Sequence, residues 1–353
     1  VVGLATPVAL AAGLNKAARN HILIRDTSAL EQMRNVDVVV FDKTGTLTEG
    51  HPTVIGWLWA QGQEEHYKDV LLAAESTSDH PLAEAIVTAL EGEEQVIPAH
   101  LDGFENITGK GVRVAYQGAE YWVGSHKLLK DYQANLSDIL ADMLTQYESD
   151  GNSIVYFGRE NDLLAVIAIK DQLRVTSMEA IRELRIQDIE ICMLTGDGER
   201  TASSVAGSLG IMRFVADAMP DDKEDFIHKL QLQGKTVAMV GDGVNDAQAL
   251  SCADVSIAMG KGTDTLMDTA MITLRTSDLL LLPKVFRLSR QTVSLMYRNL
   301  FWAFIYNTVG IFVAAGVLYP VYDILLSPAL AGAAMALSCV SVALSSLRLS
   351  SRF

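Results

Sequence analysis

The chain has 353 residues, 49% of them hydrophobic and 20% charged, and its 26 glycines and 8 prolines exclude collagen-like and disordered proteins. Its net charge of −15 argues against a nucleic-acid-binding protein, because such a protein neutralises phosphates with basic residues. The cysteines Cys192, Cys252 and Cys339 are too scattered for a disulfide framework or a zinc-type pair, so we expect the regions folded outside a membrane to lie in a reducing compartment.

Residues 1–34 open with an apolar run, VVGLATPVALAAGL, that begins at Val1 rather than at a methionine. Its 14 residues are fewer than the roughly 20 that a membrane-crossing helix needs. We expect the end of a transmembrane helix, a cytoplasmic connector after it, and a chain that is the C-terminal part of a longer protein. A signal peptide is the alternative, but the run has no basic leader and no cleavage site.

Short apolar runs alternate with helix-like segments in residues 35–52 and 165–282. This alternation indicates an α/β fold in which a parallel sheet has helices on both faces. Ligands bind to such a sheet beyond the carboxyl ends of its strands. The expected strands are 36–41, 189–194 and 236–240, and the expected helices are 177–185, 199–209 and 223–233.

Residues 53–164 interrupt that pattern with helix-like pieces and short strands rich in Tyr, Trp and Val. They contain 19 acids and 6 bases, which give a net charge of −13. Because the first pattern resumes after them, we predict a separate α+β domain inserted into the first domain. Its expected helices are 68–77 and 82–91, and its expected strands are 111–116, 121–124 and 154–157.

Residues 283–353 contain six bases and one acid, so they carry +5 whereas residues 1–282 carry −20. Two stretches of 24 uncharged residues each exceed the length of a membrane-crossing helix. We predict two transmembrane helices at about 299–319 and 324–347, with two buried helices of a soluble core as the alternative. Bases flank only the outer ends of the pair, which places both ends in the cytoplasm.

An acid follows each expected strand of the first domain, at Asp42, Asp197 and Asp242. Asp42 begins the sequence DKTGTLT, and a carboxylate at a strand end among backbone amides is suited to attack a phosphoryl group. That attack needs a divalent cation and a lysine nearby, and Lys223 in MPDDK supplies the lysine. Thr195 in TGD offers a hydroxyl and an amide at the start of a helix. The oxygen ligands suited to Mg²⁺ are Asp242, Asn245 and Asp246 in GDGVND.

The motifs DKTGTLT, TGD and GDGVNDA resemble the phosphorylation-domain motifs of P-type ATPases, which are related to haloacid-dehalogenase-like phosphatases. The resemblance covers essentially the whole chain. It implies a haloacid-dehalogenase-like, Rossmann-type phosphorylation domain in which Asp42 becomes an aspartyl-phosphate.

The same resemblance assigns roles to the residues of these motifs. It implies a Mg²⁺ site formed by Asp42, the Thr44 carbonyl and Asp242. It implies that Thr195, Lys223 and Asn245 stabilise the phosphoryl group. The catalytic residues that it implies are Asp42, Lys43, Thr44, Thr195, Gly196, Asp197, Lys223, Asp242, Asn245 and Asp246.

The inserted domain resembles the nucleotide-binding domain of heavy-metal-transporting P-type ATPases at Glu75, at the pair His80 and Pro81, and at Gly109 and Gly111 of a later GKG. The resemblance implies that these residues bind ATP, and two glycines let the backbone approach a nucleotide closely. By itself, a histidine before a proline is usually only the start of a helix. Ser125 stands where the family often has Asn, and we expect this shorter group to weaken one nucleotide contact.

Four residues of the expected crossings resemble the copper-type branch of that family: Tyr306, Asn307, Met335 and Ser338. Thioether and neutral oxygen ligands without a carboxylate suit a soft monovalent ion, either Cu⁺ or Ag⁺. A heavy-metal ATPase for zinc or cadmium is the alternative, although an intramembrane acid or base would then be expected. Packing between helices also explains such residues. The departures from the family are Cys339 for Ser, Phe312 for Pro and Gln248 for Pro.

The resemblance implies an enzyme that uses ATP and Mg²⁺ to export monovalent copper, or silver, across a membrane. The expected protein is multi-pass in a bacterial plasma membrane, with its phosphorylation and nucleotide-binding domains in the cytoplasm. Its expected partners are the lipid bilayer, ATP and a copper ion delivered by a copper chaperone, and no nucleic acid. The actuator domain and the Cys-Pro-Cys motif of the family are missing from the chain, so we expect it to be phosphorylated without completing transport.

Two other functions stay open from the residues. A membrane-anchored dehalogenase-type phosphatase has an acid two residues after the nucleophile, but Thr44 stands there and cannot activate water in that way. The acyl-phosphate is therefore expected to last long enough to drive a conformational change. The third possibility is a non-catalytic subunit that binds nucleotide and associates with other membrane helices.

Overall fold

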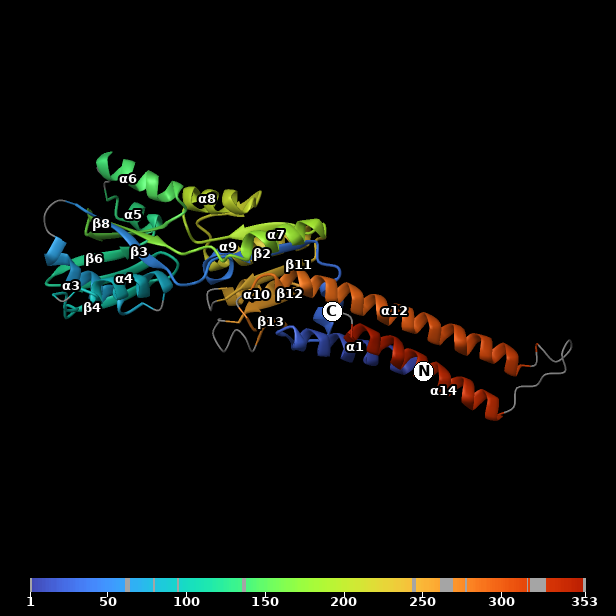
Figure 1. Ribbon diagram of the computed structural model, residues 1–353. Coiled ribbons are helices and arrows are strands. Elements are labelled where there is room, and N and C mark those ends of the chain that lie inside the picture. Colours follow the sequence, from blue (N-terminus) through green and yellow to red (C-terminus); the bar gives the residue numbers. More distant parts are fainter. Residues whose placement is uncertain are drawn as a thin grey trace.

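The computed structural model shows two sheets and, beyond the first of them, long helices that extend away from both (Figure 1). The first sheet lies between the second sheet and these helices. The structure describes residues 2–60, 64–78, 80–93, 95–134, 138–242, 246–260, 269–276, 278–315, 317 and 328–351.

The first sheet has seven strands in the order β1-β13-β12-β11-β2-β9-β10. Its strands pair in parallel, except that β1 at the edge is antiparallel to β13. The three strands expected from the apolar runs are β2, β9 and β11, so the predicted parallel α/β sheet is confirmed. The strands are β1 (Ile22–Ile24), β2 (Val38–Asp42), β9 (Glu190–Leu194), β10 (Arg213–Val215), β11 (Val237–Gly241), β12 (Val255–Met259) and β13 (Ile272–Leu274).

Helices cover both faces of this sheet. Val38 and Val40 pack on one face with residues of α9 and α10, and Val39 and Phe41 pack on the other with residues of α7 and α8. Successive strand residues alternate between faces, so a strand buried on both faces must be apolar until its end. Asp42 is the polar residue at that end. The helices are α2 (Ser28–Met33), α7 (Ser177–Ile186), α8 (Glu199–Leu209), α9 (Pro220–Leu232) and α10 (Ala247–Cys252).

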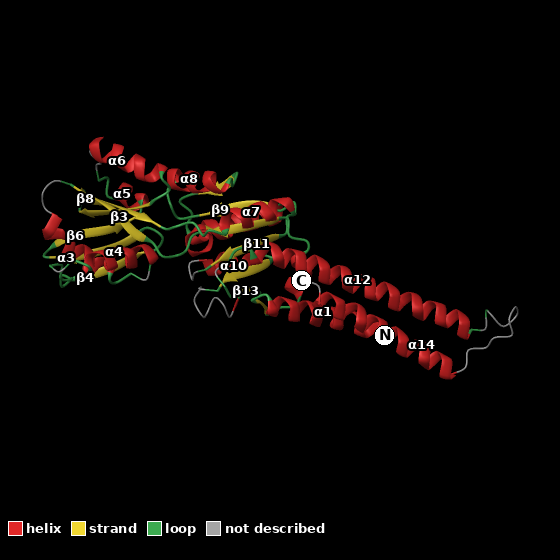
Figure 2. Cartoon of the chain, viewed as in Figure 1, coloured by secondary structure: helices red, strands yellow, loops and turns green. Residues whose placement is uncertain are grey.

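The second sheet has six strands in the antiparallel order β3-β8-β7-β6-β5-β4. Helices α3 and α4 lie on one side of it and α5 and α6 on the other (Figure 2). The elements are β3 (Thr53–Trp59), α3 (Glu64–Glu75), α4 (Pro81–Glu91), β4 (Gly103–Ile107), β5 (Gly111–Tyr116), β6 (Ala119–Gly124), α5 (His126–Asp131), α6 (Asp138–Ser149), β7 (Ser153–Arg159) and β8 (Asp162–Lys170).

The predicted end of the inserted domain at residue 164 falls inside β8. This strand pairs with β3 from Ala165 to Lys170, so the second sheet continues to Lys170. Its apolar sequence resembles the buried strands of the first sheet, which is why the pattern alone assigned residues 165–170 to the first domain. The other domain boundaries stay predictions.

Three long helices pack against one another beyond the first sheet: α1 (Val2–Arg19), α12 (Leu281–Ala314) and α14 (Pro328–Ser351). The first part of α12 is buried against the first sheet, where Val285 and Phe286 join its core. Farther along α12, Asn299 donates a hydrogen bond of 3.0 Å from Nδ2 to Ser346 Oγ on α14. This bond satisfies a buried amide inside the helix pair.

Across the described residues, no helix combines the length and the apolar character that crossing a membrane requires. This differs from the two crossings predicted at 299–319 and 324–347. Each of these segments includes residues outside the described part of the chain, among them 318–319 and 324–327. Both crossings stay predictions.

Candidate active site at the carboxyl edge of the first sheet

Asp42 ends β2 and is 6% exposed. The backbone after it makes one tight turn over Lys43–Leu47, in which Gly45 adopts a φ of +69°. A Cβ atom on Gly45 would lie 1.4 Å from Asp242 Oδ2, so only glycine leaves room for that carboxylate. The turn and Asp242 are therefore packed directly against each other.

Lys223 bridges two carboxylates at the N-terminal end of α9. Its Nζ lies 2.6 Å from Asp42 Oδ1 and 2.7 Å from Asp246 Oδ1. Burial alone would lower the pKa of Lys223, but Asp42 and Asp246 outweigh burial and raise it above its ordinary value. Lys223 is therefore a fixed positive charge beside the predicted nucleophile at neutral pH.

Three carboxylates converge at this edge. One oxygen each of Asp42, Asp242 and Asp246 lies within 4.8 Å of the others. Burial, followed by repulsion from Asp42, raises the pKa of Asp242 and that of Asp246 to about 7. Buried and half-buried carboxylates that repel one another in this way fit a hard divalent cation, and Mg²⁺ is the expected one.

The structure brings some of the residues predicted to bind Mg²⁺ together but does not describe all of them. Asp42 and Asp242 lie together, and Asp246, which was predicted to be catalytic, joins them. The loop residue Thr44 follows Asp42 in the tight turn. Asn245 lies outside the described residues, so its predicted role stays a prediction.

Arg174 holds the turn after Asp42 from the side, a role that the sequence motifs did not predict. Its guanidinium donates a 2.9 Å bond from Nε to Thr46 O and a second bond to Gly45 O. Nearby, Asp171 accepts a 2.5 Å bond from Thr48 Oγ1 and a 3.1 Å bond from Gly50 N. The signal available in the sequence was an acid and a base within four residues after β8, where the chain returns to the first sheet.

The TGD loop reaches the same turn through Lys43. The Lys43 ammonium forms an ion pair with Asp197 and donates a 3.0 Å bond to Ser153 Oγ at the start of β7. Burial alone would raise the pKa of Asp197, but Lys43 outweighs it and holds that pKa below its ordinary value. Thr195 Oγ1 donates a 3.0 Å bond to Asp197 Oδ2, whereas Gly196 is exposed.

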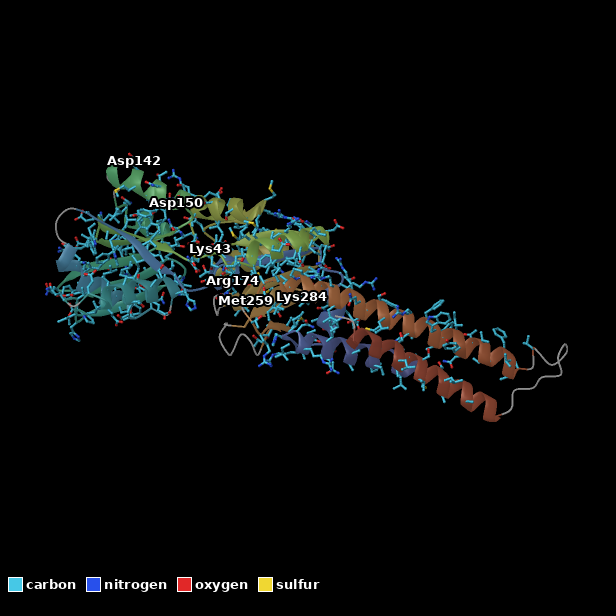
Figure 3. All side chains as sticks on the ribbon, in the orientation of Figure 1. Lys43, Asp142, Asp150, Arg174, Met259 and Lys284 are labelled. Atoms are coloured by element: carbon cyan, nitrogen blue, oxygen red, sulfur yellow. The ribbon has the colours of Figure 1, made fainter. Side chains whose placement is uncertain are left out.

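The inserted domain is closed against the first domain near this site. Lys43 and Arg174 lie where the two parts meet (Figure 3). Thr201 Oγ1 on α8 donates a 2.8 Å bond to Asn152 O beside β7. Gly109 of the GKG turn lies so close to Met219 that a Cβ there would be 2.5 Å from its sulfur.

The residues predicted to bind nucleotide lie on the inserted domain, and some of them lie near the first domain. His80 caps α4 before Pro81, and its Nδ1 accepts a 3.2 Å bond from Leu82 N. Solvent reaches the His80 ring, yet the surrounding protein desolvates it enough to lower its pKa, and Asp197 and Lys43 are the charges that affect it most. Gly111 begins β5, where a Cβ would lie 2.1 Å from Val123 O.

Glu75 ends α3 and is 6% exposed. Burial raises its pKa from 4.5 to about 7. It is therefore partly protonated at neutral pH, and the protonated carboxyl can donate a hydrogen bond that a carboxylate cannot.

Glu75→Gln should make the chain more stable at alkaline pH. The folded state binds the Glu75 proton more tightly than the unfolded chain does, so wild-type stability falls as the pH rises from 4.5 to about 7. Glutamine has no such proton, and we expect a gain of about 3 kcal/mol in the free energy of unfolding at pH 8 and none at pH 4. Urea unfolding of the wild type and the variant at both pH values measures this gain. Glu91→Gln, at the exposed end of α4, is the control, and equal gains at both pH values would contradict the assignment.

The residues predicted to bind the transported metal are not placed as one group. Tyr306 and Asn307 are exposed on α12. Ser338 on α14 is buried, and among the described residues no partner bonds its hydroxyl. The side chain of Met335 lies outside the described residues. This ligand set stays a prediction.

The sequence and the fold match known proteins. The family model described as haloacid dehalogenase-like hydrolase matches residues 36–254. A copper-exporting P-type ATPase of Legionella pneumophila is 42% identical over 348 residues, which cover 99% of this chain and 47% of that protein. A silver exporting P-type ATPase of Salmonella typhimurium is 43% identical over 353 residues, which cover 99% of this chain and 42% of that protein.

Among solved structures, a zinc-transporting PIB-type ATPase in its E2.Pi state matches with a TM-score of 0.68 and 34% identity. The match covers 99% of this chain and 55% of that chain. This chain therefore spans about half the length of each of these three proteins. The resemblance to P-type ATPases and the haloacid-dehalogenase-like fold, both predicted from the motifs, are confirmed.

Proposed function

This chain belongs to the haloacid dehalogenase-like hydrolase family, and we propose that it is the catalytic part of a P-type ATPase that exports monovalent copper or silver. The observation that carries the proposal is the cluster at the sheet edge, where Lys223 contacts Asp42 and two further carboxylates converge. Relatives named as copper-exporting and silver exporting support the cargo. Because the chain also matches the structure of a zinc-transporting ATPase, zinc is the competing candidate for the transported ion.

In the proposed reaction an oxygen of Asp42 attacks the terminal phosphorus of ATP. A bond forms between that oxygen and phosphorus, and the bond to the bridging oxygen of ADP breaks. Lys223 holds Asp42 Oδ1, which leaves Oδ2 for the attack and offsets negative charge as the phosphoryl group arrives. Mg²⁺ held by Asp42, Asp242 and the Thr44 carbonyl would supply further neutralisation of the transferring group.

Thr44 determines how long the acyl-phosphate lasts after the transfer. A hydroxyl at this position cannot take a proton from water as a carboxylate does, so the acyl-phosphate persists. Glu75, His80, Pro81, Gly109 and Gly111 are proposed to hold ATP, and the approach of Gly109 to Met219 supports a nucleotide bound between the two domains.

We place the protein in a membrane as a multi-pass protein of a bacterial plasma membrane, with both sheet domains in the cytoplasm. The relatives are P-type ATPases that export metal ions, which supports this location. A copper chaperone that delivers the ion to the cytoplasmic side is part of the same proposal.

Labelling with radioactive ATP in the presence of Mg²⁺ and Cu⁺ tests the proposal. We expect an acid-stable, hydroxylamine-sensitive phosphoprotein that Asp42→Asn abolishes. Asp37→Asn, just before the same strand, is the matched control because its exposed carboxylate accepts a bond from Thr236 N and is not in the cluster at Asp42. Labelling that survives Asp42→Asn would reject the nucleophile, and fast hydrolysis of simple phosphate esters would favour a phosphatase instead.

A further inference from the structure

A second group of metal-binding side chains lies away from Asp42, on the helices that cover one face of the first sheet. Glu224 and His228 lie one turn apart on α9, and Cys252 ends α10. One ligand atom of each residue lies within 4.8 Å of the others. Figure 1 shows α9 and α10 beside the first sheet.

The spacing of these atoms is close to that of a metal site. Bond lengths of about 2.0 to 2.3 Å put the ligand atoms of tetrahedral zinc roughly 3.3 to 3.7 Å apart. Glu224 Oε1 and His228 Nε2 are already 3.5 Å apart. Small rotations of these exposed and half-buried side chains would therefore bring all three ligand atoms to metal-binding distances.

Gln231 fixes the tautomer of His228 that a metal needs. Its side-chain Nε2 donates to Cys252 O at 2.9 Å and to Asp254 Oδ2 at 3.2 Å, so its Oε1 must face His228. That oxygen lies 3.2 Å from His228 Nδ1, which can then only donate. The lone pair of the neutral ring is left on Nε2, which faces Glu224. Outer-shell carbonyl partners of this kind orient histidines that bind metals.

We propose that Glu224, His228 and Cys252 form a binding site for a zinc-class divalent cation. The three residues supply oxygen, nitrogen and sulfur, and a fourth position stays open for water. On binding, the Cys252 thiol loses its proton to the buffer and the thiolate sulfur bonds the metal. None of these residues takes part in the proposed phosphoryl transfer.

The site would connect the two helices that supply the partners of Asp42. Glu224 directly follows Lys223, and α10 begins directly after Asp246. A metal that joins α9 to Cys252 would restrain these helices relative to each other. Occupancy should therefore stabilise the first domain without contacting the phosphate.

Titration of the metal-free chain with Co²⁺, followed by displacement with Zn²⁺, tests the site. With excess Mg²⁺ present to fill the carboxylate site at Asp42, we expect a near-ultraviolet thiolate-to-cobalt absorption band that Cys252→Ser removes, together with one equivalent of tightly bound Co²⁺. His228→Gln should weaken binding at least tenfold, and Gln231→Met should weaken it about 10- to 100-fold while the band remains. His100→Gln, an exposed histidine of the inserted domain, should change nothing.

Three results would overturn the site. The first is a wild-type chain without a thiolate band, and the second is a band and stoichiometry that survive Cys252→Ser. Binding unchanged by His228→Gln would remove His228 from the ligand set and contradict the proposal as stated. Circular dichroism of each variant establishes folding, and labelling of Asp42 by ATP separates failure of this site from failure of the proposed function.

Discussion

Gly45→Ala should abolish phosphorylation of Asp42 by ATP. The added Cβ would lie 1.4 Å from Asp242 Oδ2 and 2.3 Å from its Cγ, so the carboxylate has to turn away from Asp42. A displacement of about 1 Å at a reacting centre costs on the order of a hundredfold in rate. Because Asp242 is also a proposed Mg²⁺ ligand, we expect a loss of at least about a hundredfold in labelling rate.

The left-handed backbone at Gly45 adds a smaller cost, and a control separates the two effects. Alanine at a positive φ costs roughly 1 to 2 kcal/mol. Gly234 has a φ of +80°, and nothing lies within 4 Å of the position that a methyl group would take there, so Gly234→Ala carries the backbone cost alone. We expect Gly234→Ala to lower the free energy of unfolding and to leave labelling unchanged. Equal labelling of Gly45→Ala and Gly234→Ala would show that phosphorylation of Asp42 does not depend on the present position of Asp242.

The edge of the first sheet was predictable because its strands are buried on both faces. The three expected apolar runs could end only where the chain leaves the core, and an acid follows each run within three residues. In a parallel sheet these ends lie on one edge. Asp42 and Asp242 meet because β2 and β11 are neighbours in it. The motif spacing therefore predicted most of the candidate site.

The contacts that position this edge were not predictable from local patterns. Arg174 reaches Thr46 and Lys43 reaches Ser153 across more than a hundred residues, so neither pairing shows in a local pattern, and the second also depends on how the two domains close. The end of the inserted domain inside β8 was mispredicted for a similar reason, because the sequence of an apolar strand does not reveal which sheet the strand joins. Cys252 approaches His228 only because α9 and α10 pack side by side.

Lys223→Met should both prevent labelling and destabilise the chain in a pH-dependent way. Asp42 is 6% exposed and Asp246 is 2% exposed, and Lys223 is the cation that bonds both. Removing one partner of a buried ion pair costs about 3 to 5 kcal/mol, because the remaining charge is left uncompensated. Phosphoryl transfer loses the positive charge that offsets the incoming phosphate, so we expect no detectable phosphoprotein.

The pH dependence follows from the carboxylates that remain. The pKa of Lys223 lies above its ordinary value, so in the wild type its stabilisation is fully present across pH 6 to 8. The pKa of Asp246 is already about 7, and without Lys223 it rises further, so the folded variant binds more protons than the wild type. Its stability should therefore fall more steeply from pH 6 to pH 8.

Urea unfolding at pH 6 and pH 8 measures this difference between Lys223→Met and the wild type. Lys229→Met is the matched control. Lys229 is exposed on the same helix, so its substitution removes the same charge without leaving a buried acid unpaired. We expect the control to have nearly wild-type stability at both pH values and to be phosphorylated. If Lys223→Met were destabilised equally at pH 6 and pH 8, the neighbouring carboxylates would not be taking up protons to compensate for the lost lysine charge.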